Sequence, residues 1–469
     1  MTLHGLSYLV LLPLVVAALR LLPAGRPRQA GVLAVSYAFY ASWGLGFLAV
    51  LLLSTALNWF CGAALARRPT RGRLLAGVTL NLLLLAGFKL LPPLSAAWAP
   101  DSPLARVLLP VGMSFWTFQA LSYLLDRYRE EPLDPTPLEF ALFLAFWPTV
   151  LSGPIARLPE LLPQLRRLAP AGWDDLAWGA RRIVLGLFFK LVLSGILAQG
   201  LIAGAGLDAG FDERAGGWGG IDAWTLAIGF GFQLFFDFAG YSHLAIGSAR
   251  LLGVELPENF ARPYLSPTPA VFWTRWHMSL SFWIRDYVFL PLATLRRSTA
   301  WRLGAIFLSM VLFGLWHGAT ATFLVWGAYH GALLVAHRLI QMGKRLAPWW
   351  PPEAVERPLG AVLTFACIGL GWIPFRAHDL GRAWELGRAV LAPSSYLHLS
   401  LRADVYIVTF LVVAGYFVVE AVHRLVVREQ ARPAVRRALW LLAPPYYAAL
   451  ILLAICWSAQ EAGFVYLQF

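Results

Sequence analysis

The sequence predicts an all-α integral membrane protein, and composition is the first reason. Of 469 residues, 59% are hydrophobic and 13% are charged, with a mean hydropathy of +0.64. Soluble domains carry roughly a quarter charged residues. The apolar residues also form long runs close to the ~20 residues of a membrane-spanning helix, without the ~10-residue alternating segments of a membrane β-barrel. Both a soluble globular protein and a β-barrel are therefore excluded.

Apolar segments follow one another along the whole chain. We expect them near residues 5–22, 31–43, 46–66, 74–91, 107–125, 138–156, 183–203, 223–249, 303–320, 323–340, 359–375, 404–424 and 438–458. The first is expected to be a retained span, because residues 1–4 lack the Lys or Arg of a secretory signal. Segment 138–156 contains Pro148, Gly153 and Pro154, which interrupt helices, so it is expected to dip into the membrane and return on the same side. The total is about 11–13 transmembrane helices plus re-entrant or interfacial helices, in one integral domain over 1–469.

Arginine-rich connections predict the orientation of these segments. The basic residues that we expect on the cytoplasmic side are Arg26, Arg28, Arg67, Arg68, Arg71, Arg73, Arg157, Arg166, Arg167, Arg181, Arg182, Arg424, Arg428, Arg432, Arg436 and Arg437. The weakly charged or acidic connections at 92–103 and 207–222 are expected outside. The excess of 38 Lys and Arg over 25 Asp and Glu, +13, follows from this topology, so no nucleic-acid partner is expected.

The sequence contains no recognisable cofactor motif. Cys61, Cys367 and Cys456 lie far apart in apolar stretches, which suggests structural thiols. Neither a glycine-rich phosphate loop nor a His/Cys spacing typical of zinc is found. We therefore expect no metal and no permanently bound cofactor, and we look for chemistry among the polar residues at membrane depth.

Segment 223–249 carries one polar stripe. Gln233, Asp237 and Tyr241 are spaced by four and therefore share a helix face. A carboxylate at membrane depth needs a partner or a water-filled cavity, and Arg250 or Arg275 is the expected partner. Both a structural anchor and a direct role in chemistry are consistent with this stripe.

Residues 272–287 alternate aromatic, basic and polar side chains too often for a lipid-facing span. We expect a buried or interfacial helix here, with Trp273, Trp276, His277 and Leu280 on one face. The indole rings would exclude water from His277 and lower its pKa. Taken alone, this histidine is consistent with a structural or a functional role.

Segments 303–320 and 323–340 each contain a GxxxG pair, Gly314/Gly318 and Gly327/Gly331, which predicts close helix packing. A histidine precedes the second glycine of each pair. A histidine inside an apolar span is costly and is a functional candidate by default, which applies to His317 beside Trp316. His330 is expected to pack at its glycine contact.

Eight sequence motifs together resemble the membrane-bound O-acyltransferase (MBOAT) family, in particular the bacterial branch that contains the alginate O-acetyltransferase membrane subunit and the D-alanyl transfer protein of teichoic acids. The matching motifs are LPVGMSFWTFQALSY (109–123), SGPI (152–155), FDFAGYS (236–242), PENF (257–260), FWTRWHMSLSFWIRDY (272–287), GLWHG (314–318), GWIPFR (371–376) and YLQF (466–469). They cover essentially the whole chain. The resemblance implies peripheral N-terminal spans over about 1–105, a catalytic core over about 106–345 and C-terminal spans over about 346–469.

The resemblance also implies a fold and a set of roles. The fold would be a helical funnel with a central tunnel, through which an acyl group passes from a cytoplasmic thioester to an acceptor beyond the membrane. His317 matches the histidine regarded as catalytic in the family, and His277 matches the polar position that lines the tunnel in this branch. Further candidates for the tunnel or for donor contacts are Trp276, Trp316, Asp237, Tyr241, Arg275, Arg285 and Asp286.

O-acylation requires a base that removes a hydroxyl proton while the oxygen attacks a thioester, and a neutral imidazole suits this role. The leading expectation is O-acetylation of an exported cell-envelope polysaccharide by a multi-pass protein of the bacterial inner membrane. Acetyl-CoA or an acyl-carrier phosphopantetheine would be the donor, and an extracytoplasmic acyltransferase the partner. The alternative within the class is D-alanyl transfer from a carrier protein to a teichoic-type polymer. A transporter or channel is the alternative from another class.

Overall fold

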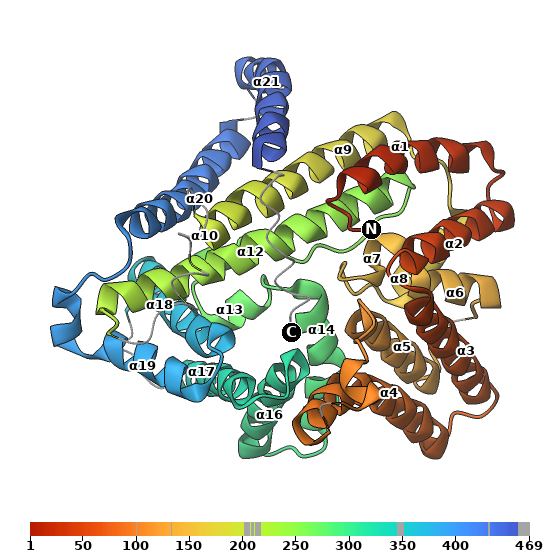
Figure 1. The fold of residues 1–469 in the computed structure, drawn as a ribbon, viewed down its shortest axis with the longest axis horizontal. Coiled ribbons are helices and arrows are strands. Elements are labelled where there is room, and N and C mark those ends of the chain that lie inside the picture. Colours follow the sequence, from red (N-terminus) through yellow and green to blue (C-terminus); the bar gives the residue numbers. More distant parts are fainter. Residues whose placement is uncertain are drawn as a thin grey trace. The chain divides into compact units, whose positions relative to one another are not determined.

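A computed structural model describes residues 1–99, 101–132, 134–200, 207, 211, 217–344, 351–429 and 432–457. In these residues the chain is helical and contains no strand, which confirms the all-α prediction. Figure 1 shows α1 (Leu6–Leu21), α2 (Arg26–Ala41), α3 (Leu45–Arg67), α4 (Arg71–Trp98), α5 (Met113–Tyr128), α6 (Pro137–Ala145), α7 (Trp147–Val150), α8 (Leu158–Arg167), α9 (Trp173–Leu187), α10 (Gly195–Gln199), α12 (Gly220–Leu251), α13 (Pro269–Trp273), α14 (Met278–Ile284), α15 (Leu290–Thr294), α16 (Thr299–His317), α17 (Ala321–Lys344), α18 (Glu353–Arg376), α19 (Leu380–Leu391), α20 (Ala403–Glu429) and α21 (Pro433–Trp457). Two π-helical stretches, η2 (Phe188–Ser194) and η4 (Arg285–Phe289), continue α9 and α14.

Nine helices of the described chain are long and apolar enough to cross a membrane. They are α3, α4, α9 with its continuation to Gln199, α12, α16, α17, α18, α20 and α21. This number is lower than predicted because segments 5–22, 31–43 and 107–125 give α1, α2 and α5, each of 16 residues. A helix of that length is about 24 Å long, whereas the hydrocarbon core is about 30 Å thick. The polytopic class is confirmed.

Segment 138–156 is interrupted near the predicted prolines. α6 ends at Ala145, the short α7 covers Trp147–Val150, and residues 151–157 are not helical. Almost all of this stretch is buried. Its return to the same membrane side stays a prediction.

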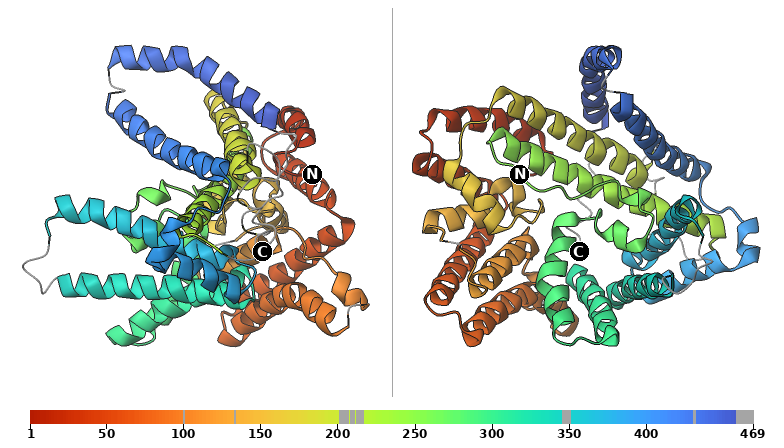
Figure 2. Two further views of the ribbon diagram at one scale, coloured as in Figure 1. Left: turned by 60° about the vertical axis from the view of Figure 1, so that its left-hand side comes forward. Right: turned by 180° about the vertical axis from the view of Figure 1, so that it is seen from behind.

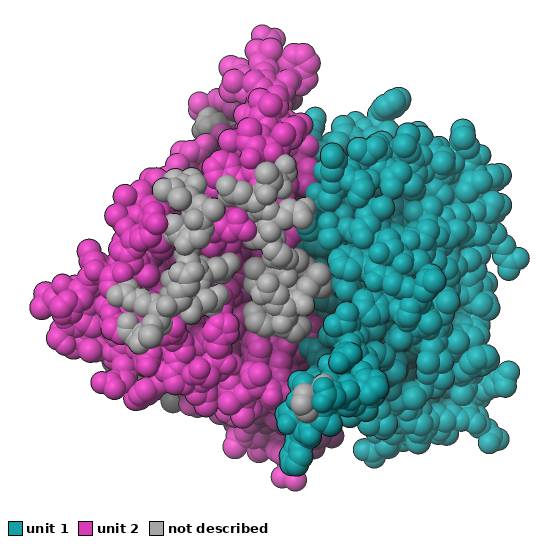
Figure 3. Space-filling model, viewed as in Figure 1, with its two compact units in different colours: residues 1–183, 241–259, 279–287 teal, residues 184–240, 260–278, 288–469 magenta. Residues whose placement is uncertain are grey.

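The helices group into two compact units, which Figure 3 colours separately. Unit 1 contains residues 1–183, 241–259 and 279–287, and unit 2 contains residues 184–240, 260–278 and 288–469. The division falls inside α9, α12, α14 and η4. Both candidate histidines, His277 and His317, belong to unit 2.

In unit 2, α16 packs along α17, and α17 and α18 run side by side as a hairpin (Figure 2). Gly314 and Gly327 permit the close packing of α16 on α17. A Cβ atom on Gly314 would lie 2.4 Å from the carbonyl oxygen of Phe323, and one on Gly327 would lie 2.6 Å from the carbonyl oxygen of Met310. The close packing predicted from the two GxxxG pairs is confirmed.

Substituting Gly327 by alanine is expected to destabilise the protein by about 1–3 kcal/mol, because a methyl group cannot enter the contact without moving α16. The midpoint of thermal unfolding in detergent measures the effect. Gly304→Ala is the matched control, since Gly304 lies on α16 with no atom within 4 Å of its Cβ position. Equal midpoints for the two variants would show that the glycine contact does not matter for stability.

Candidate active site

His317 is the last residue of α16 and is 4% exposed. Aromatic rings from three helices surround it. Trp326 of α17 stands edge-on at a ring-centroid distance of 5.3 Å, and Phe375 of α18 at 5.1 Å. Phe313 and Trp316 of its own helix lie at 5.1 and 4.7 Å, and Phe323 stacks at 6.0 Å. The imidazole is therefore held in a water-poor cage that leaves little freedom of orientation.

The position of His317 at a helix end has a chemical consequence. The carbonyl end of an α-helix carries partial negative charge, and a cation in the last turn is stabilised there. An imidazole that accepts a proton at this place becomes an imidazolium facing that partial charge.

His277 does not lie within a helix, which corrects the prediction of one continuous helix over residues 272–287. α13 ends at Trp273, α14 begins at Met278, and His277 has a φ of +43° in the left-handed region. The helical spacing that placed Trp273, Trp276 and Leu280 on one face with His277 therefore does not apply. Left-handed backbone is costly for residues other than glycine, although histidine adopts it more often than most, and such residues cluster at functional sites.

The environment of His277 in unit 2 is aromatic and closed. The side chain is fully buried, and Phe238 of α12 stands perpendicular to it at 4.5 Å. Burial lowers the pKa of His277 to about 3. The imidazole is therefore neutral at neutral pH, and it can donate one hydrogen bond and accept another.

Aromatic rings connect the surroundings of the two histidines within unit 2. Trp276 lies 4.9 Å from Trp372, Trp372 lies 5.6 Å from Phe375, and Phe375 contacts His317. Trp276 is buried and Trp316 is half-buried. Rings of α18 thus link Trp276 to the cage of His317, and the role of the tryptophans in a tunnel stays a prediction.

His277→Asn and His277→Ala should separate the role of the backbone from that of the imidazole. Asparagine tolerates the left-handed region, so the Asn variant should keep its unfolding midpoint while kcat/KM for acyl transfer falls by about 10²-fold. The Ala variant should lose both stability and rate. Unfolding in detergent and initial rates provide the two readouts. An Asn variant with wild-type kcat/KM would show that the imidazole is not needed.

Asp237 pairs with neither Arg250 nor Arg275, which corrects the expected partner. Its carboxylate forms an ion pair with Lys190 of η2, and the two side chains are 4% and 3% exposed. Arg250 instead forms ion pairs with Asp175 at 2.8 Å and with Glu255 at 3.1 Å. Gly240 permits the close approach of α12 to η2, because a Cβ on Gly240 would lie 2.8 Å from the backbone nitrogen of Lys190.

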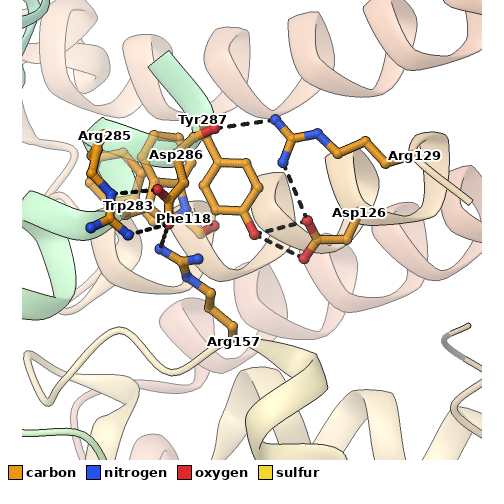
Figure 4. A network of polar contacts seen from close by, with 8 residues as sticks. All are labelled: Phe118, Asp126, Arg129, Arg157, Trp283, Arg285, Asp286 and Tyr287. Atoms are coloured by element: carbon orange, nitrogen blue, oxygen red, sulfur yellow. Dashed lines mark hydrogen bonds and ion pairs between the residues drawn. The ribbon is translucent and has the colours of Figure 1, made fainter. Parts of the chain in front are cut away.

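Arg285 and Asp286 belong to unit 1 and form a polar network there, shown in Figure 4. Asp286 lies 2.7 Å from Arg157 and 2.6 Å from Arg285. Burial alone would raise the pKa of Asp286, but hydrogen bonds from Arg285 and Arg157 outweigh burial and hold it below its ordinary value. The hydroxyl of Tyr287 donates to the carboxylate of Asp126 at 2.9 Å, so the network ties η4 to α5.

The remaining candidates fall in different places. Tyr241 is buried in unit 1, beside Ser152. Arg275 lies in unit 2 and donates to the carbonyl of Leu265 at 3.5 Å. The motif at 466–469 and the acidic residues at 208, 212 and 213 lie outside the described residues. In the described chain, no three His, Cys, Asp or Glu side chains come together as metal ligands would.

Sequence reasoning missed several residues at the site. Phe238, Trp326, Trp372 and Phe375 build the cages of the two histidines, but an aromatic residue in an apolar span carries no distinguishing local signal. His330, expected to pack, lies buried against α18, where a Cβ on Gly371 would come 2.5 Å from its Nε2.

Fold and site together define a multi-pass helical membrane protein with buried histidines in aromatic cages. The chain belongs to the membrane-bound O-acyltransferase family, whose sequence model matches residues 32–368. It is an O-acyltransferase, and the transporter alternative is set aside.

A probable alginate O-acetylase of Pseudomonas aeruginosa is 35% identical over 78% of this chain and 70% of its own length. A peptidoglycan O-acetyltransferase of Helicobacter pylori is 30% identical over 79% of this chain and 75% of its own length. A teichoic acid D-alanyltransferase of Bacillus subtilis is 28% identical over 70% of this chain and 80% of its own length.

Proposed function

We propose that the protein transfers an acetyl group from a cytoplasmic thioester through the membrane for O-acetylation of an exported cell-envelope polysaccharide. The observation that carries the proposal is the buried imidazole of His317, caged by aromatic rings at the end of α16 in a chain of this family. The acetylases of alginate and peptidoglycan at 30–35% identity support the acetyl group and the polysaccharide. A separate extracytoplasmic acyltransferase is the proposed partner that completes the transfer.

His317 is the general base of this reaction. It takes the proton of the acceptor hydroxyl as the oxygen attacks the thioester carbonyl and a C–O bond forms. The C–S bond then breaks, and the imidazolium returns the proton to the leaving thiolate. His277 donates a hydrogen bond that orients the donor or steadies the developing oxyanion, and Trp276 and Trp316 exclude water that would hydrolyse the thioester.

The basic helix ends face the cytoplasm in this proposal. α3 ends at Arg67, α4 begins at Arg71, and α12 carries Arg250 in its last turn. α16 begins beside Arg302, so His317 lies at the opposite, outward end of that helix. The thioester donor therefore enters from the basic side, and the acceptor meets the acyl group near His317 in the bacterial inner membrane.

Acyl transfer by the purified protein tests the proposal. Radiolabelled acetyl-CoA and a D-alanyl-loaded carrier protein are offered separately to the wild type and to His317→Ala. Label transfer or thioester cleavage from acetyl-CoA that depends on His317 is the expected result. Activity with the loaded carrier alone would instead support D-alanyl transfer to a teichoic-type polymer, the reaction named for the Bacillus subtilis relative. Transfer that persists in His317→Ala would contradict the assigned base.

A further inference from the structure

Unit 2 contains a cavity of about 430 Å³ at the corner where α15 meets the start of α16. Its lining begins at Leu292 of α15 and Arg296 of the connection, and it ends at Leu308 in the third turn of α16. Trp301 closes the corner, because its indole N–H donates to the carbonyl oxygen of Leu292 at 2.7 Å. In the orientation proposed for α16, this corner lies at the cytoplasmic surface of the membrane, at the opposite end of the helix from His317.

One end of the cavity is positively charged. Arg296 lines it and stacks on the ring of Trp301 at 4.7 Å, and Arg297 and Arg302 are close to it in sequence. Residues 287–352 contain no Asp or Glu, and within the described part of the chain none of these three arginines forms an ion pair. Guanidinium groups without a carboxylate partner are suited to bind phosphate.

The other end of the cavity is apolar. Gly304, Leu308 and Leu312 are spaced by four and therefore share one face of α16. Gly304 and Leu308 line the cavity, and no atom of the described residues lies within 4 Å of the Cβ position of Gly304. Leu308 and Leu312 are 45% and 43% exposed. Since α16 rises about 14 Å between Thr299 and Leu308, the cavity extends from the charged surface into the hydrocarbon region.

We infer that this cavity binds an anionic phospholipid of the cytoplasmic leaflet, with the phosphate at Arg296 and one acyl chain along Gly304 and Leu308. Trp301 lies between the two parts, at the level where membrane proteins concentrate tryptophan. Basic pockets at the cytoplasmic ends of spans are typical sites for acidic lipid headgroups. A free phosphate would leave the apolar end unused, whereas a phospholipid matches both ends. The inference rests on the proposed orientation and not on the proposed acyl transfer.

Retention of defined lipids by the full-length protein in detergent tests the inference, with native mass spectrometry as the readout. Phosphatidylglycerol and phosphatidylcholine with identical acyl chains are offered separately, so that the two lipids differ only in the headgroup and its charge. The apparent Kd for phosphatidylglycerol should be lower than that for phosphatidylcholine by about tenfold or more. Phosphatidylglycerol should also raise the midpoint of thermal unfolding, because it binds the folded protein.

Two variants address the two ends of the cavity. Arg296→Gln should weaken phosphatidylglycerol binding by about tenfold or more, because a charge-assisted contact to phosphate is lost. Gly304→Leu should weaken it as well, since the new side chain enters the apolar end. Arg71→Gln is the matched control and should leave the affinity within about twofold, because Arg71 is exposed at the start of α4 and does not line the cavity. Unfolding midpoints without lipid check that each variant is folded.

Three outcomes would overturn the inference. The first is equal affinity for the two lipids, or unchanged phosphatidylglycerol affinity in both Arg296→Gln and Gly304→Leu. The second is displacement of phosphatidylglycerol by inorganic phosphate at equal concentration, which would show that the apolar end contributes nothing. The third is binding of an acidic carrier protein that depends on Arg296, without retention of phosphatidylglycerol.

Lipid retention is measured without any acyl donor, so its result is independent of the proposed function. Retained phosphatidylglycerol together with an absence of transfer that depends on His317 would contradict the acetyl-transfer proposal and leave the lipid site in place. Transfer that depends on His317, together with no preference for phosphatidylglycerol, would contradict the lipid site alone.

Discussion

His317→Ala is expected to lower kcat/KM for acyl transfer by about 10²–10⁴-fold, the contribution of a positioned general base. The loss should appear mainly in kcat, because the imidazole acts when the acceptor hydroxyl loses its proton. Donor binding should change little, since the proposed role of His317 is proton transfer. The measurement is initial-rate kinetics with labelled acetyl-CoA, together with binding of acetyl-CoA to the same variant.

Two further variants make this result specific. His317→Gln keeps a polar side chain of similar size in the aromatic cage but cannot act as a base, so it should be as inactive as alanine with a smaller loss of stability. His423→Ala removes an exposed histidine of α20 and should leave the rate unchanged. A His317→Gln variant with near wild-type kcat would show that this histidine shapes the cage and does not move the proton.

The parts of the site that sequence predicted are those that local patterns specify. A histidine before the second glycine of a GxxxG pair marks an inward-facing helix position, and His317 is indeed buried at the contact of α16 with α17. Helical spacing also placed Asp237 on a polar stripe of segment 223–249, and the residue is buried on α12. Burial of one face is a property of a single helix, and the periodicity of the sequence predicts it.

The parts that sequence missed depend on tertiary structure. Lys190 and Asp237 are 47 residues apart, and nothing near either residue identifies the other. His277 was predicted within one helix over residues 272–287, yet the chain turns at His277 with a positive φ. Packing of the buried rings around this turn outweighs local helix propensity, which is a weak guide in a dense core.

The ion pair between Lys190 and Asp237 yields the second large prediction. Lys190→Met or Asp237→Leu alone should lower the free energy of unfolding by about 3–5 kcal/mol, because each leaves one charge buried without its opposite. The double variant should recover most of this loss, since two apolar side chains need no partner in a low-dielectric interior. Replacement of a whole buried pair by apolar residues is often neutral or stabilising.

A double-mutant cycle tests this expectation, with unfolding followed by denaturant titration in mixed micelles. Lys344→Met is the matched control, because Lys344 pairs with Glu356 at 43% and 35% side-chain exposure and should cost less than about 1 kcal/mol. Additive losses in the double variant would show that the two charges do not stabilise each other. Recovery of stability together with recovery of acyl transfer would show that the pair holds α12 in position, and with it Phe238 against His277. Recovery of stability alone would place one of the two charges in the reaction itself.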